Sequence, residues 1–206
     1  MAWAPDYVTT DELRSFITRS AVTVDDTELA FAVSSASRVI DEFCGRQFGQ
    51  LAAAAPRVYT AEWDGRRSRW LVDIDDLVTT TDLAVAVDDN DDEVFDKTVT
   101  AYRLWPFNAV ENGLPWTRLI IDPDSTNKPV AAEGAVQVTA MWGWAAVPTA
   151  VKQATLIEAN RIFQRRVSPY GIAGSPETGS ELRLLRAVDV DAQKILQPYR
   201  RWWGAA

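Results

Sequence analysis

Apolar residues change their spacing twice along the chain, and these changes divide it into three parts. Up to about residue 48 they recur every three or four positions, which is typical of amphipathic helices. From about 51 to 144 they form short runs between Gly, Pro, Asp and Asn clusters, which favours strands and turns. Helical spacing then returns. The pattern predicts an α+β protein, a small bundle of about four helices with a β-rich insertion between the second and third long helices.

The two N-terminal helices have recognisable ends. Thr9 and Glu12 stand three residues apart, as in a capping box, and predict where the first helix begins. The second should begin near Asp25 and Asp26, because carboxylates favour the positive end of a helix dipole, and Gly45 should end it. The apolar side chains that we expect on the buried faces of these helices are Leu13, Phe16, Ile17, Leu29, Val33, Ala36, Val39, Ile40 and Phe43.

Two further helices are predicted after the insertion. The third starts near Pro148, since proline suits a first helical turn, and runs to about Arg166. A glycine-rich loop over about 168–179 then leads to a last helix at about 189–196, which Pro198 ends. The candidate strands of the insertion are 57–60, 69–72, 83–87, 101–105, 116–121 and 135–141.

Composition and charge restrict the possible functions. The net charge of −8 argues against a general nucleic-acid binder, although residues 160–206 carry eight basic side chains against four acidic ones. The absence of histidine excludes Ser-His-Asp and Cys-His catalysis, and the single Cys44 cannot form an internal disulfide. Neither a signal peptide nor a run of about 18 apolar residues is present, so we expect no membrane association.

Acidic residues are concentrated between Asp73 and Asp96, where ten of them occur without a basic residue. A calcium loop fails the pattern, because Glu93 replaces the required glycine and Val99 the final glutamate. We therefore predict no metal, no cofactor and no catalytic residue. The run could be a solvated hairpin tip, or an acidic surface facing a conduit for DNA. The densest part consists of Asp88, Asp89, Asp91, Asp92 and Glu93.

Nine tryptophans are many for 206 residues, and such residues usually fill cores and protein interfaces. Trp202 and Trp203 follow Arg200 and Arg201 near the end of the sequence, and we expect this segment either to anchor a partner or to fold back on its own helix. A rival interpretation is a ligand- or carbohydrate-binding β module. Its stacking platform would consist of Trp63, Trp70, Trp105 and Trp116.

Three segments, taken in order, resemble a known family. The first runs through Thr10–Leu13, Asp25–Leu29 and Ala36–Phe48, as two helices and a closing turn. The second is Val136–Trp144, followed by Val147 and Pro148. The third combines Arg165–Arg166, Ser168–Gly171 and Asp189–Asp191. Together they are similar to the head-to-tail connector family of long-tailed phages, also called adaptor or head-completion proteins.

The resemblance implies a structural virion protein and not an enzyme. Residues 1–206 would form a single connector domain, with a helical core at about 8–48 and 148–197, the β insertion at about 51–144 and a tail at 198–206. About twelve copies would form a ring in the neck of the virion, beneath the portal protein and next to a stopper or tail-completion protein. Double-stranded DNA would pass through this ring without specific binding. The protein would be made in the host cytoplasm.

Two sets of contact residues follow from this interpretation. We expect a subunit interface on the helical faces left outside the core, which include Ser34 and Ser35. We expect the C-terminal segment to dock onto the portal. The interface residues are Arg38, Glu158, Arg161 and Arg165, and the docking residues are Tyr199, Arg200, Arg201, Trp202 and Trp203.

Other functions remain as alternatives to the connector. A stopper or tail-completion protein would be another part of the virion. A cryptic metal-dependent enzyme is a further alternative from a different class.

Overall fold

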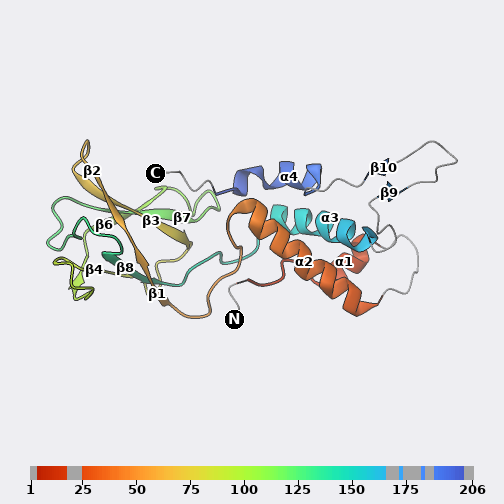
Figure 1. Cartoon of the computed structure of the whole chain (residues 1–206), viewed down its shortest axis with the longest axis horizontal. Helices are drawn as coiled ribbons and strands as arrows, with labels where there is room; N and C mark the ends of the chain where they lie inside the picture. The colour runs from red at the N-terminus through yellow and green to blue at the C-terminus, as the bar shows by residue number, and fades with distance from the viewer. Residues whose placement is uncertain (1–3, 18–24, 166–171, 174–181, 184–187, 202–206) are drawn as a thin grey trace. The chain divides into compact units, whose positions relative to one another are not determined.

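The computed structural model describes residues 4–17, 25–165, 172–173, 182–183 and 188–201 (Figure 1). The chain divides into two compact units. The β unit comprises residues 49–146, and the helical unit comprises residues 4–48 together with the described residues from 147 onward. The mixed α+β class is as predicted, and the described part of the chain contains four α-helices.

The helices begin and end close to the predicted positions. The Thr9 N–H donates to Glu12 Oε2 at 2.7 Å and the Glu12 N–H to Thr9 Oγ1 at 3.1 Å, which confirms the capping box. Asp25 caps the second helix, and Gly45 ends it in the left-handed conformation with a φ of 62°. The elements are α1 (Thr10–Ile17), α2 (Asp26–Cys44), α3 (Thr149–Arg165), α4 (Val190–Leu196) and the 3₁₀ helix η2 (Gln197–Tyr199).

The core of the helical unit forms where α1 and α2 pack against α3. Leu13 of α1 and Leu29 of α2 are fully buried, and Phe163 of α3 packs in the same cluster. Phe16, which we expected on the buried face, is 41% exposed. Leu13 and Ile17 lie four residues apart on one side of this short helix, and that side alone contacts the core.

A buried hydrogen-bond network joins the N-terminal segment to α2 and to the turn that follows it. The Tyr7 ring is buried, and its hydroxyl donates to Asp41 and accepts the Phe48 N–H at 3.0 Å. The Tyr7 N–H donates to Ser37 Oγ at 3.1 Å. Burial raises the pKa of Tyr7, so the hydroxyl stays protonated and can donate. Phe48 packs edge-on between Tyr7 and Tyr199, which fixes the turn that follows Gly45.

Eight strands lie between α2 and α3 in chain order and form two antiparallel sheets. One sheet has the order β1-β8-β4-β5 and the other β2-β3-β7-β6. Strands are not confined to this region, because β9 (Ile172–Ala173) pairs with β10 (Leu182–Arg183) after α3. The eight strands are β1 (Ala55–Tyr59), β2 (Ala61–Asp64), β3 (Arg69–Leu77), β4 (Ala84–Val87), β5 (Lys97–Thr98), β6 (Tyr102–Trp105), β7 (Trp116–Ile121) and β8 (Val136–Ala140).

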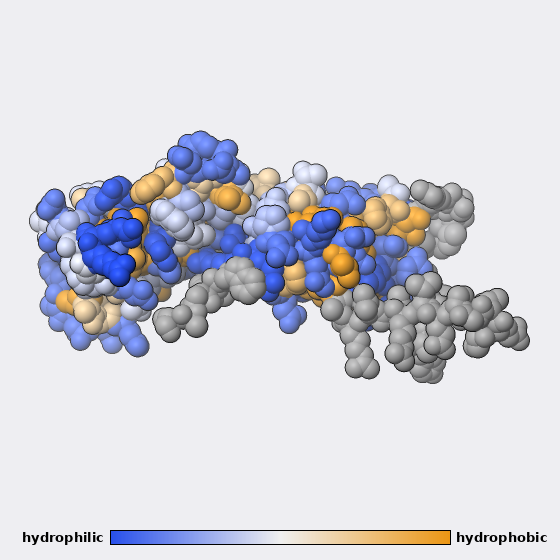
Figure 2. All heavy atoms as spheres, turned by 90° about the horizontal axis from the view of Figure 1, so that it is seen from above, coloured by the Kyte–Doolittle hydropathy of each residue, from blue (hydrophilic) through white to orange (hydrophobic). Residues whose placement is uncertain are grey.

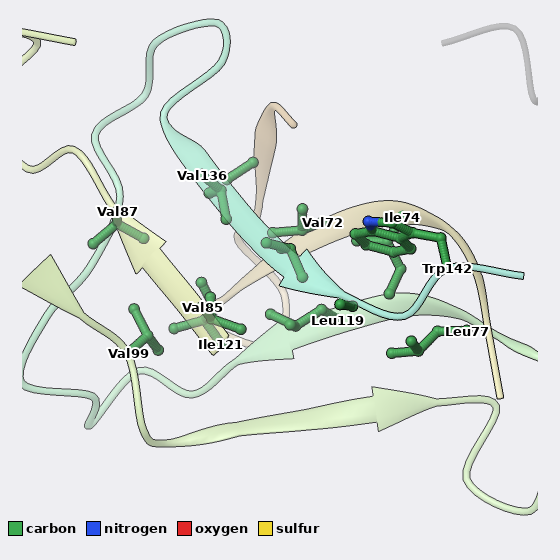
Figure 3. Packing of buried hydrophobic residues seen from close by; sticks show 13 residues of the cluster. Val72, Ile74, Leu77, Val85, Val87, Val99, Leu119, Ile121, Val136 and Trp142 are labelled. Carbon is green, nitrogen blue, oxygen red and sulfur yellow. The ribbon is translucent and has the colours of Figure 1, made fainter. Parts of the chain in front are cut away.

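The two sheets of the β unit enclose one apolar core (Figure 3). Alternating residues of each strand point inward, as the half-buried pattern of β8 shows, where Val136, Val138 and Ala140 are buried. Trp142 follows β8 and is the largest fully buried side chain. The inward side chains labelled in Figure 3 are Val72, Ile74, Leu77, Val85, Val87, Val99, Leu119, Ile121, Val136 and Trp142.

The turn at Gly143 joins the end of β8 to neighbouring backbone. The Gly143 N–H donates to the Asp76 carbonyl oxygen at 2.7 Å, and the Trp144 N–H donates to the Gly49 carbonyl oxygen at 2.9 Å. The Trp144 indole donates to the buried carboxylate of Asp76 at 2.8 Å. Gly143 has a φ of 109°, and a Cβ placed there would lie 1.9 Å from the Gly49 oxygen. Only glycine fits this position.

Candidate protein-contact surfaces

Glu158 was predicted to lie at the subunit interface, but its side chain is 0% exposed. Its carboxylate accepts hydrogen bonds from the Arg161 guanidinium and, at 3.1 Å, from the Asp189 N–H. Because Asp189 caps α4, this carboxylate ties α3 to the start of the next helix. Glu158 therefore has an internal role in this structure, and its buried side chain is not available to a neighbouring subunit.

A hollow of about 570 Å³ lies within the helical unit, lined by residues of α2, α3, α4 and the segments next to α4. We call it the helical groove. Both remaining α3 arginines of the predicted interface, Arg161 and Arg165, line it together with Arg200. Apolar groups also reach the surface of this unit in the view of Figure 2. The groove therefore combines basic and apolar groups, which suits a protein contact. Its other main lining residues are Glu42, Phe43 and Ile162.

Arg38, the other predicted interface residue, is bound to its own chain. Its guanidinium donates to the carbonyl oxygens of Ala4 and Pro5, both at 2.7 Å, and pairs with Asp41 at 3.0 Å. Arg38 therefore holds the N-terminal segment against α2.

Phe31 is also part of α2 and is 70% exposed, yet the sequence interpretation missed it. Its spacing from the exposed Ser34 and Ser35, three and four residues, could have revealed it.

The first residues of the predicted docking segment pack on α2. The Arg200 guanidinium lies 4.8 Å from the Phe43 ring centroid, and the Arg201 N–H donates to the Cys44 carbonyl oxygen at 2.8 Å. Burial raises the pKa of the Cys44 thiol to about 12, so this side chain stays an uncharged packing group. Residues 202–203 lie outside the described residues.

The acidic loop, Asp88–Glu93, joins β4 to β5 and has one member that differs from the rest. Asp88 is only 4% exposed, and its carboxylate accepts the N–H groups of Asn90, Asp91 and Glu93 at 3.0, 2.7 and 2.7 Å. Burial alone would raise the pKa of Asp88, but these backbone donors hold it below its usual value. Asp88 therefore shapes the loop and does not project a charge to solvent. The exposed carboxylates are those of Asp89, Asp91, Asp92 and Glu93.

Within the described ranges, no three carboxylate or thiol side chains converge as the ligands of a cation would. Asp92 instead accepts the Val94 N–H and the Asn90 side-chain amide, each at 3.0 Å. The internal hydrogen bonds of Asp88 and Asp92 account for the conformation of the loop.

A second hollow, of about 400 Å³, lies on the β unit and was not predicted. We call it the arginine pocket. Cross-strand pairing places Trp105 of β6 opposite Arg118 of β7, and the Arg118 guanidinium lies 5.6 Å from the Trp105 ring centroid. Trp105 and Phe107 are 42% and 60% exposed, whereas Ile120 is buried at the floor. Its six lining residues are Arg67, Arg69, Trp105, Phe107, Arg118 and Ile120.

The four tryptophans of the predicted stacking platform do not share a surface. Trp70 pairs with Trp63 on one side and with Ile121 on the other, so these side chains point to one face of their sheet. Trp105 lies opposite Arg118, three residues along β7 from Ile121, and therefore points to the other face. Trp116 is partly buried against the core. This geometry gives a sugar ring no common platform.

No protein-family model matches the chain, and the search of curated proteins gives no match either. Among the helices of the described residues, none has the length and apolar character needed to cross a membrane.

Proposed function

We propose that this protein is a structural subunit of a phage head-to-tail connector, located in the virion neck, that assembles into a ring and docks onto the portal protein. Double-stranded DNA would pass through the ring without specific binding. The exposed carboxylates of the acidic loop would suit a surface near such a path, because they repel phosphate.

The observation that carries the proposal is how the first and third family-like segments fold together. The first segment, which ends at Phe48, and the described parts of the third belong to the helical unit, although more than a hundred residues separate them, whereas the second segment, Val136–Trp144, belongs to the β unit. The closing turn of the first segment is fixed there by the Tyr7 network. Residues 51–134, a region longer than a minimal connector needs, also belong to the β unit. This separation is what we expect of a connector core with an inserted module.

Exposed side chains on both units support a role in protein contact. Large apolar side chains face solvent on both units, such as Phe31 of the helical unit and Phe107 of the β unit, and are available for contact with a partner. Arginine and aromatic residues together line the arginine pocket and the helical groove, and these types anchor protein interfaces. A subunit that contacts several neighbours needs more than one such surface.

Removing residues 202–206 is expected to weaken binding to the portal protein of the same phage by at least about thirtyfold, because each anchoring aromatic contributes about 2 kcal/mol or more. The truncation keeps Arg200 and Arg201, whose contacts with α2 stabilise the helical unit. Portal affinity would be measured by surface plasmon resonance, with circular dichroism to compare the folds.

A second truncation that removes only residues 204–206 provides the control, because it keeps both tryptophans of the predicted docking segment. We expect it to bind the portal like the full chain. Equal portal affinity for the two truncations would contradict the docking role of this segment.

A further inference from the structure

The arginine pocket is lined by three guanidinium groups and by no carboxylate. Carboxylates lie next to these groups: Asp64 is 3.5 Å from Arg67 and 3.4 Å from Arg69, Asp73 pairs with Arg118, and Glu62 adds a second favourable charge near Arg118. The Arg67 side chain is 69% exposed. A partner that fills the pocket should therefore bring carboxylates, together with an apolar group for Trp105 and Phe107.

The acidic loop offers both carboxylates and an apolar group. Four of its carboxylates are exposed, and the adjoining Val94 is 53% exposed. The three backbone hydrogen bonds to Asp88 fix the loop before any contact is made, so ordering it on binding costs little. Loop and pocket thus match in charge and in apolar character.

The two surfaces lie on different sheets of the β unit. The arginine pocket lies on the outer face of the β2-β3-β7-β6 sheet, where Trp105 and Arg118 point away from the core. The acidic loop continues from β4, in the sheet on the other side of that core. A contact between loop and pocket therefore joins two copies through different surfaces, and such a contact can repeat until a ring closes.

We propose that the arginine pocket of one copy receives the acidic loop of a second copy. The inference rests on the proposed function, since it names one subunit contact of the ring. Arginine–carboxylate pairs would orient the two copies, and the Val94 side chain would pack against the exposed aromatic rings. Such a contact weakens with rising salt, because part of its attraction is electrostatic.

Charge reversal of each surface tests this contact in the full chain. The pocket variant combines Arg67→Glu with Arg118→Glu, and the loop variant combines Asp89→Lys with Glu93→Lys. Analytical ultracentrifugation at low ionic strength measures self-association. We expect each variant alone to associate at least about tenfold more weakly than the wild type. An equimolar mixture of the two variants should recover association, because each reversed surface then meets an opposite charge.

Matched controls change the same number of charges elsewhere on the β unit. Arg66→Glu with Lys128→Glu controls for the pocket, and Glu111→Lys with Glu133→Lys controls for the loop; all four residues are exposed. Both controls should associate like the wild type. Circular dichroism and thermal unfolding would check that all variants fold.

Three results would overturn the inference: wild-type association by both variants, a mixture no better than either variant alone, or a wild type that does not associate. Oligonucleotide binding that the pocket variant loses, with self-association unchanged, would assign the pocket to a nucleic acid instead. Rings on the portal that tolerate both variants would reject only this contact and leave the connector role standing. A wild type that fails to bind the portal would count against the proposed function itself.

Discussion

Replacing Gly143 with alanine is expected to lower the free energy of unfolding by more than about 4 kcal/mol, among the largest effects of single substitutions. The added Cβ would lie 1.9 Å from the Gly49 carbonyl oxygen, and this neighbour is backbone that cannot rotate away. A φ of 109° adds strain for any residue with a Cβ. Urea denaturation followed by tryptophan fluorescence measures the loss, because Trp142 and Trp144 are buried beside the turn.

Gly113→Ala separates strain from steric overlap. Gly113 also has a positive φ, 67°, but no atom lies within 4 Å of the position where its Cβ would be. We expect this control to lose only about 1–2 kcal/mol, the usual cost of a left-handed residue. If Gly143→Ala lost no more than Gly113→Ala, the close approach of the chain at Gly49 would be wrong.

Glu158→Ala is expected to destabilise the protein by about 3–5 kcal/mol, because it leaves the largely buried Arg161 guanidinium without its carboxylate. It also removes the acceptor of the Asp189 N–H at the start of α4. Glu158→Gln keeps the shape and an acceptor oxygen, so we expect a smaller loss of about 1–3 kcal/mol. Chemical denaturation of the three proteins gives these differences.

Asp11→Ala provides the exposed counterpart. The Asp11 side chain is 85% exposed and pairs with Arg14 at the same i,i+3 spacing, so its loss should cost no more than about 0.5 kcal/mol. The double variant Glu158→Ala with Arg161→Ala should be more stable than Glu158→Ala alone, since no buried charge is then left unpaired. A Glu158→Ala variant as stable as Asp11→Ala would contradict the internal role of this carboxylate.

The sequence predicted best those features that depend on neighbouring residues. The capping box of Thr9 and Glu12, the end of α2 at Gly45 and the strand predicted at 135–141, which is β8, are set within a few positions, and the structure confirms each. The strand predicted at 116–121 matches β7. These signals come from local hydrogen bonding and from the period of apolar residues.

Features that depend on distant partners were missed or misplaced. The strand predicted at 69–72 continues as β3 through Asp73, Asp75 and Asp76, which belong to the acidic run of the sequence. It can do so because arginine side chains and the Trp144 indole donate hydrogen bonds to these carboxylates. The sequence placed Glu158 on the surface of α3, but in the structure the start of α4 covers its carboxylate. Arg118 joins the arginine pocket only through the pairing of β6 with β7. No periodicity along the chain specifies such contacts.

Copies of this chain are proposed to form a closed ring on the portal. Negative-stain electron microscopy of the purified full chain, alone and mixed with the portal protein, tests it most directly. We expect closed rings of about twelve copies, coaxial with the portal. A protein that stays monomeric at every concentration and leaves the portal particles unchanged would contradict it.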